Sequence, residues 1–128
     1  MNKAIFKIDG KRVWIAGSRG LVGAACQTKF QHMDCQIIID PPKSDLDLRD
    51  EVAVNDFIEI QKPDVIILAA AKVGGIGDNA ANDDVFYADN IQIQNAVINA
   101  AAIHNVQRLV FLGSSCIYPR NCPQPIQE

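Results

Sequence analysis

The sequence predicts an α/β fold with a doubly wound parallel sheet, and three observations lead to this class. The chain has 128 residues, of which 48% are hydrophobic and 21% charged, as in one soluble globular domain. Short runs that are apolar throughout alternate with longer stretches of helical pattern. Strands that are apolar on both sides are buried on both faces, which is typical of parallel strands covered by helices.

The first half of the chain supplies two expected strands and two expected helices. The run RVWIA predicts a strand at residues 12–16, and a helix is expected to follow at 21–31. The run CQIII predicts a second strand at 35–39. A helix is expected at 50–62, because its apolar residues recur at helical spacing and Pro63 disfavours helical backbone just before it.

The second half continues this alternation. A third strand is expected at residues 65–69, a long helix rich in alanine, isoleucine and asparagine at about 83–104, and a fourth strand at 109–112. A short additional strand is expected at about 45–48, between the second strand and its helix. The fourth strand is apolar and would form an uncovered edge, which predicts a marginally stable chain that self-associates or needs a partner.

Charge and cysteine usage exclude several functions. The formal net charge is −3 and the basic residues are scattered, so neither nucleic acid nor a membrane is an expected partner. The longest clean apolar run, residues 65–71, is too short for a membrane span, and the N-terminus lacks a signal-peptide core. The four cysteines form no Cys-x-x-Cys pair and the two histidines lie outside metal-binding spacings, so no metal is expected. Reduced thiols in a cytoplasmic protein are the simple interpretation.

The first expected strand leads into the glycine motif GSRGLVG, with glycines at Gly17, Gly20 and Gly23. The motif follows a strand and opens a helix, as the dinucleotide-binding fingerprint of a Rossmann fold requires. Gly17 would permit the tight turn, Gly20 would let a pyrophosphate approach the helix N-terminus, and Gly23 would let the helix pack close to the sheet. A purely structural glycine-rich turn is the alternative, and nucleotide binding is favoured. The expected cofactor contacts also include the residues between these glycines, namely Ser18, Arg19, Leu21 and Val22.

The choice between NAD and NADP stays open on these residues alone. Asp40 ends the second strand, close to where an acidic residue binds a ribose 2′-hydroxyl and selects NAD. A carboxylate there would repel a 2′-phosphate. Lys43 and Arg19 could instead pair with a 2′-phosphate, as NADP requires.

Four stretches of the chain together resemble the GDP-L-fucose synthases, a family of extended short-chain dehydrogenase/reductases. They are GSRGLVG, LAAAKVGGI at residues 68–76, the long helix with Asn90 and Asn95, and GSSCIYP at residues 113–119. The resemblance implies the N-terminal portion of an enzyme that converts GDP-4-keto-6-deoxy-D-mannose to GDP-L-fucose by 3,5-epimerisation and NADPH-dependent 4-reduction. It also implies a nucleotide-sugar substrate in the complete enzyme, and a homodimer or a complementary chain as partner.

The same resemblance favours NADP over NAD and implies where the cofactor is bound. Lys43 takes the place of the basic residue that follows the second strand in the family. The remaining contacts that the resemblance implies are Ala70, Leu112, Gly113 and Ser115. For Lys72, a contact with cofactor or substrate and a solvated side chain both stay open. Asn90 and Asn95 are expected to hydrogen-bond within the fold.

The stretch GSSCIYP carries the implied catalytic residues. By resemblance, Ser114 hydrogen-bonds the C4 carbonyl of the substrate, and Cys116 transfers protons at the carbons beside it. Such protons are acidic because their loss gives an enolate, and a thiol with a pKa of about 8.5 can be tuned to exchange them. A small buried hydrophobe is the alternative for Cys116.

One expected catalytic pair is absent from the sequence. Short-chain reductases use a tyrosine with a lysine four residues later, but Ile91 follows Tyr87 at that spacing and Cys122 follows Tyr118. We therefore expect a single NAD(P)-binding Rossmann domain over residues 1–128, truncated before the Tyr-x-x-x-Lys helix and the substrate domain, and inactive by itself. A non-catalytic NAD(P)-binding module and the relic of a truncated gene are the alternatives.

Overall fold

A four-stranded parallel sheet forms the centre of the molecule, with strand order β2-β1-β3-β4. The computed structural model describes residues 6–74, 83–114 and 117–127. The strands are β1 (Lys11–Ala16), β2 (Cys35–Ile38), β3 (Val65–Leu68) and β4 (Arg108–Phe111). The chain steps outward from β1 to β2 and then returns to place β3 on the other side of β1. This reversal creates a topological switch point between β1 and β3, which is where open α/β sheets bind ligands.

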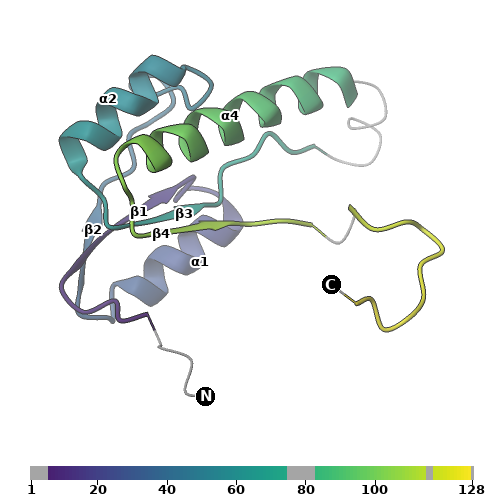
Figure 1. Ribbon diagram of the computed structural model, residues 1–128, viewed down its shortest axis with the longest axis horizontal. Helices are drawn as coiled ribbons and strands as arrows, with labels where there is room; N and C mark the ends of the chain where they lie inside the picture. The colour runs from purple at the N-terminus through teal and green to yellow at the C-terminus, as the bar shows by residue number, and fades with distance from the viewer. Residues whose placement is uncertain (1–5, 75–82, 115–116, 128) are drawn as a thin grey trace.

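Three helices cover the two faces of the sheet. They are α1 (Leu21–Phe30), α2 (Glu51–Gln61) and α4 (Asp83–Ile103). Figure 1 shows α2 and α4 side by side on one face and α1 on the opposite face. The doubly wound α/β class predicted from the sequence is therefore confirmed, and the boundaries of the elements agree with the expected ones to within a few residues. In the described part of the chain, no helix is long and apolar enough to cross a membrane.

The prediction of a short strand at about residues 45–48 is wrong. The segment forms turns instead, because the amides of Asp45 and Leu46 both donate to the carbonyl of Pro42, at 2.9 and 3.0 Å. The amide of Asp50 then donates to the carbonyl of Asp47 at 2.9 Å. These local bonds curl the backbone, so its amides and carbonyls are not available to a neighbouring strand.

The core lies on both faces of the sheet, which explains why the strands are apolar throughout. On the side of α2 and α4, the buried Trp14 packs against Phe57, with ring centroids 4.8 Å apart. On the side of α1, the buried Val13 and Ile15 pack against Cys26 and other partly buried residues. The last four residues of β1, 13–16, are therefore buried on both faces of the sheet.

Asp50 and Lys62 set the two ends of α2. The Asp50 carboxylate accepts hydrogen bonds from the amides of Val52 and Ala53, both at 3.1 Å, and so caps the helix. Lys62 has a left-handed backbone (φ 47°) and ends the helix before Pro63, as the sequence indicates.

The strand β4 lies at the edge of the sheet, as the sequence indicates. It pairs with β3 on one side, and no strand of the described residues pairs with its other side. Its apolar side chains remain accessible, with Val110 39% and Phe111 48% exposed. Unpaired backbone groups beside apolar side chains favour pairing with another chain.

We expect concentrated protein to self-associate through this edge and Val110→Lys to reduce the association, because a charged side chain disfavours pairing at an edge strand. Sedimentation velocity over a range of protein concentrations measures this. Val52→Lys is the matched control, since Val52 is an exposed apolar residue on α2, away from the edge. A wild-type chain that stays monomeric, or an equal effect of Val52→Lys, would contradict the expectation.

Candidate functional site

A cavity of about 270 Å³ lies at the switch point, where the carboxyl ends of β1, β2 and β3 meet. One wall is the glycine loop after β1, with Gly17, Arg19 and Gly20. A second wall comes from residues between 40 and 49, which follow β2. The rest comes from residues 69–71 after β3 and from α4.

Two glycines shape the loop because no side chain fits at their positions. Gly17 has a φ of +90°, and a Cβ there would lie 2.6 Å from the backbone nitrogen of Ala70. A Cβ at Gly23 would lie 2.0 Å from the carbonyl oxygen of Gly17. The close packing expected of Gly23 is therefore directed at the glycine loop itself.

The N-terminus of α1 faces the cavity without a capping group. Gly20 is its N-cap residue and lines the cavity, and there is neither a side-chain cap nor an acidic residue in the first turn. The first amides of a helix have no partner within the helix and carry the positive end of its dipole. This helix terminus can therefore bind an anion.

Asp40 holds the glycine loop in place. Its Oδ1 accepts a hydrogen bond from the indole nitrogen of Trp14 at 3.0 Å. Its Oδ2 accepts from the amides of Gly17 and Ser18, both at 3.1 Å, and from the Ser18 hydroxyl at 3.4 Å. The carboxylate that could have selected NAD is thus already engaged by donors from β1 and the loop.

Two cations lie beside Asp40. The guanidinium of Arg19 donates to the backbone carbonyls of Asp40 at 2.8 Å and Pro41 at 3.0 Å, and Lys43 lines the same cavity. Within residues 6–74, 83–114 and 117–127, no ion pair joins Arg19 or Lys43 to a carboxylate. Neither cation is therefore held in an ion pair within these residues, although Lys43 lies close enough to Asp47 to help lower the pKa of that carboxyl.

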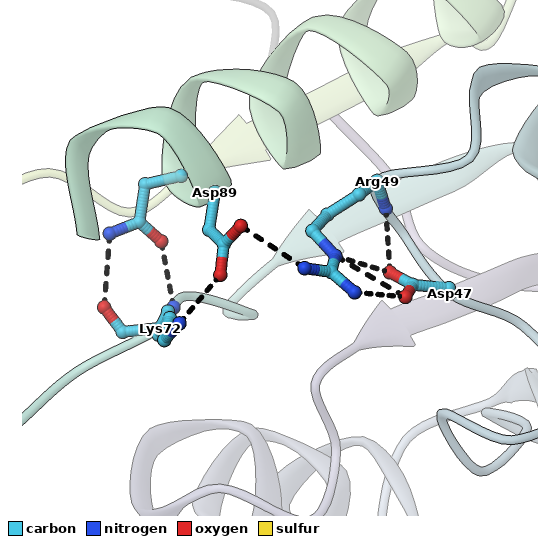
Figure 2. Close-up of polar contacts among 5 residues, drawn as sticks. Asp47, Arg49, Lys72 and Asp89 are labelled. Carbon is cyan, nitrogen blue, oxygen red and sulfur yellow. Dashed lines mark hydrogen bonds and ion pairs between the residues drawn. The ribbon is translucent and has the colours of Figure 1, made fainter. Parts of the chain in front are cut away.

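Figure 2 shows a chain of four charged residues, of which Asp47, Arg49 and Asp89 line the same cavity. Arg49 contacts Asp47 at 2.6 Å through Nη2 and at 3.0 Å through Nε, and it contacts Asp89 at 3.1 Å through Nη1. Lys72 donates to the second oxygen of Asp89 at 2.8 Å. Asp47 and Arg49 precede α2, Lys72 follows β3, and Asp89 lies on α4, so the chain joins three separate segments.

Hydrogen bonds within this group keep its carboxylates ionised. Those from the Arg49 side chain lower the pKa of Asp47 to about 2. Hydrogen bonds from Lys72 and then Arg49 lower the pKa of Asp89, and those to Asp47 and Asp89 raise the pKa of Arg49. The positive and negative charges within this group of four residues therefore largely cancel near neutral pH.

Lys72 is paired within the fold, although its side chain remains 43% exposed. Besides its contact with Asp89, its ammonium lies 5.5 Å from the centre of the Phe86 ring. The Asn90 side chain accepts a hydrogen bond from the Lys72 amide at 2.7 Å and donates one to the Lys72 carbonyl at 3.0 Å, which confirms the expected role of Asn90.

The sequence analysis did not identify Asp47, Arg49 and Asp89 as residues of the site. The alternating charges of LDLRD are the only signal in the sequence, and they do not indicate Asp89 as a partner.

Some of the expected cofactor-binding residues line the cavity, and the others lie beside it. Those that line it are Gly17, Arg19, Gly20, Lys43 and Ala70. Ser18 instead bonds Asp40, while Leu21 is 92% exposed at the first turn of α1 and Val22 is half-exposed beside it. Gly23 lies buried behind the loop.

The expected catalytic end of the site follows β4. The amide of Leu112 donates to the carbonyl of Leu68 at 3.3 Å, so the pairing with β3 continues one residue past β4. The carbonyl of Ser114 accepts from the amide of Ile117 at 3.3 Å. Leu112, Gly113 and Ser114 do not line the cavity. Ser115 and Cys116 lie outside the described residues.

The remaining described cysteines offer no metal site. Burial, with a smaller effect of Asp34, raises the pKa of Cys35, and its thiol contacts the carbonyl of Phe30 at 3.5 Å. Among the described residues, no group of three or more histidine, cysteine, aspartate or glutamate side chains could hold a metal ion.

Known proteins of similar sequence are nucleotide-sugar enzymes. The chain is similar to GDP-L-fucose synthase 1 from Arabidopsis thaliana, with 45% identity over 117 residues that cover 91% of this chain and 36% of that protein. It is also similar to a GDP-L-fucose synthase from Sinorhizobium fredii, with 40% identity over 124 residues that cover 97% of this chain and 39% of that protein.

Solved structures show the same arrangement of strands and helices. A GDP-mannoheptose C4 reductase from Campylobacter jejuni with NADP bound has a TM-score of 0.83 and 30% identity, over 95% of this chain and 38% of that one. The chain thus spans 36–39% of the length of these relatives. The family model described as the NAD dependent epimerase/dehydratase family matches residues 13–128. Because this match includes the glycine loop and every other wall of the cavity, the chain belongs to the NAD dependent epimerase/dehydratase family.

Proposed function

We propose that this chain is the NADP(H)-binding N-terminal part of a GDP-L-fucose synthase. The observation that carries the proposal is the cavity at the switch point. Among the described residues, it combines a helix N-terminus that no side chain caps with two cations, Arg19 and Lys43, that form no ion pair. Ligands of open α/β sheets bind in this crevice. The similarity to GDP-L-fucose synthases and to a reductase with NADP bound supports this choice of cofactor.

Each part of the cavity suits one part of the dinucleotide. The free amides of α1 beside Gly20 suit the pyrophosphate, with Leu21 and Val22 at the same helix terminus. Arg19 and Lys43 suit the 2′-phosphate, since both can pair with it. The further contacts in this proposal are Ala70 on the wall after β3 and, at the nicotinamide end, Leu112, Gly113 and Ser115.

The complete reaction would act on GDP-4-keto-6-deoxy-D-mannose. The C4 carbonyl would be reduced by the hydride that bound NADPH supplies. Ser114 would donate a hydrogen bond to the carbonyl oxygen, where negative charge develops. Cys116 would remove and return protons at the carbons on either side of the carbonyl, which changes their configuration.

Turnover requires a group that this sequence lacks. The 128 residues contain no tyrosine with a lysine four residues later, the pair that protonates the ketone oxygen in short-chain reductases. Loss of a general acid costs a factor of about 10² to 10⁴ in rate. We therefore propose that residues 1–128 by themselves bind NADPH without turnover, and that the tyrosine and lysine are supplied from outside these residues. The free thiols of Cys26, Cys35 and Cys122 fit a reducing compartment such as the cytoplasm.

The pairing of Lys43 with a 2′-phosphate is tested by Lys43→Gln. We expect the wild-type chain to bind NADPH more tightly than NADH, and the variant to bind NADPH about tenfold more weakly while its affinity for NADH changes little. Isothermal titration calorimetry at fixed salt measures both affinities. Lys29→Gln, which removes an exposed charge on α1, is the control. If the wild-type chain binds no NADPH, the proposed function is wrong.

The role of Asp40 is tested by Asp40→Asn. An amide in place of the carboxylate would face its NH₂ group toward donors from Trp14 or the loop, so we expect the free energy of unfolding to fall by about 1–3 kcal/mol. The affinities for NADPH and NADH should fall by similar factors, because the loop serves both. Urea unfolding and calorimetry measure these quantities, with the exposed Asp34→Asn as control. A selective gain in NADPH affinity would instead show that the carboxylate opposes the 2′-phosphate.

A further inference from the structure

We propose that Arg49 is a positioning residue of the cofactor cavity, which fixes the wall at residues 46–49 relative to α4 through Asp47 and Asp89. The inference rests on the proposed function, because it takes NADP(H) as the occupant of the cavity. Arg49 would act through the two carboxylates and not through a bond to the cofactor. It would therefore affect how well the cavity is formed before the cofactor binds.

Arg49 is placed where the walls of the cavity meet. In the described part of the chain, its contact with Asp89 is the polar side-chain contact that joins the wall at residues 46–49 to α4. Lys72 joins the segment after β3 to the same carboxylate. Asp89 thus receives one cation from each wall, and its two oxygens fix both walls against one helix (Figure 2).

The shape of the guanidinium explains why the residue is an arginine. Nε and Nη2 contact the Asp47 carboxylate, while Nη1 points to Asp89. A planar group with five donors can bond two carboxylates in a fixed geometry, whereas a lysine ammonium is a point charge without a preferred plane. Charge alone would not reproduce this link.

Burial distinguishes this group from an ordinary surface ion pair. The Asp89 side chain is only 14% exposed, although Arg49 and Lys72 are 35% and 43% exposed. Exposed pairs contribute little to stability, but a network on one shielded carboxylate restricts several side chains together. Loss of Arg49 would leave Asp89 paired with Lys72, so we expect the chain still to fold while its two walls become less well fixed relative to each other.

A preformed cavity binds more tightly because less ordering accompanies binding. We expect Arg49→Met to weaken NADPH binding about tenfold in the full chain. Arg49→Lys should weaken binding nearly as much, because it restores the charge without the planar fork. Lys29→Met, which removes a charge outside the cavity, should leave the affinity unchanged.

Hydrogen exchange gives a second measurement that does not depend on the cofactor. Arg49 has no bond to residues 70–72, yet faster amide exchange there in Arg49→Met and Arg49→Lys would show that its effect passes through Asp89. A change of NADPH affinity no larger than in Lys29→Met would overturn the inference, as would unchanged exchange at residues 70–72. Arg49→Lys decides the matter if Arg49→Met does not fold.

The two measurements also separate this inference from the proposed function. If the wild-type chain binds NADPH and the exchange at residues 70–72 does not respond to Arg49, the inference fails and the proposed function stands. If the wild-type chain binds no NADPH while the exchange responds, the proposed function fails, and the link between the walls is supported without its cofactor role.

Discussion

The carboxylate of Asp40 is the constraint on which the cavity depends. One oxygen bonds the indole of Trp14, which is fully buried and packs against Phe57 of α2. The other bonds the amides at the start of the glycine loop. The turn at Gly17, with its positive φ, is thereby tied to the buried core through Trp14. The unusual backbone of the loop persists because the surrounding structure stabilises it.

This use of Asp40 determines how charge is distributed around the cavity. Its oxygens accept hydrogen bonds from backbone and indole donors, and in the described part of the chain it forms no ion pair with the neighbouring Arg19 or Lys43. Arg49 and Lys72, in contrast, are paired with carboxylates. Arg19 and Lys43 are therefore the cations of this group that can pair with an anionic ligand, as the proposed contact with the 2′-phosphate requires.

The sequence predicts backbone features better than side-chain partners. The apolar runs identify the parallel strands because burial on both faces excludes polar residues, and GSRGLVG identifies its turn because Gly17 and Gly23 have no room for a Cβ. The prediction of a strand near residue 46 is wrong, because hydrogen bonds to the Pro42 carbonyl favour a turn over extended backbone. Asp40 occupies the expected position, but its bonds to the loop and Trp14 depend on side-chain direction. The link between Arg49 and Asp89 spans 40 residues, and no local pattern encodes it.

The two halves of the site differ in how completely this chain organises them. The half that is proposed to hold the nucleotide is fixed by Asp40 on one side and by Asp89 on the other. The half that follows β4 has an unpaired edge among the described residues, and its apolar residues Phe111 and Leu112 are exposed. Catalysis requires groups held more closely than binding does. Residues 1–128 are therefore suited to the proposed binding of the cofactor, while the proposed role of Ser114 depends on a further surface that covers β4.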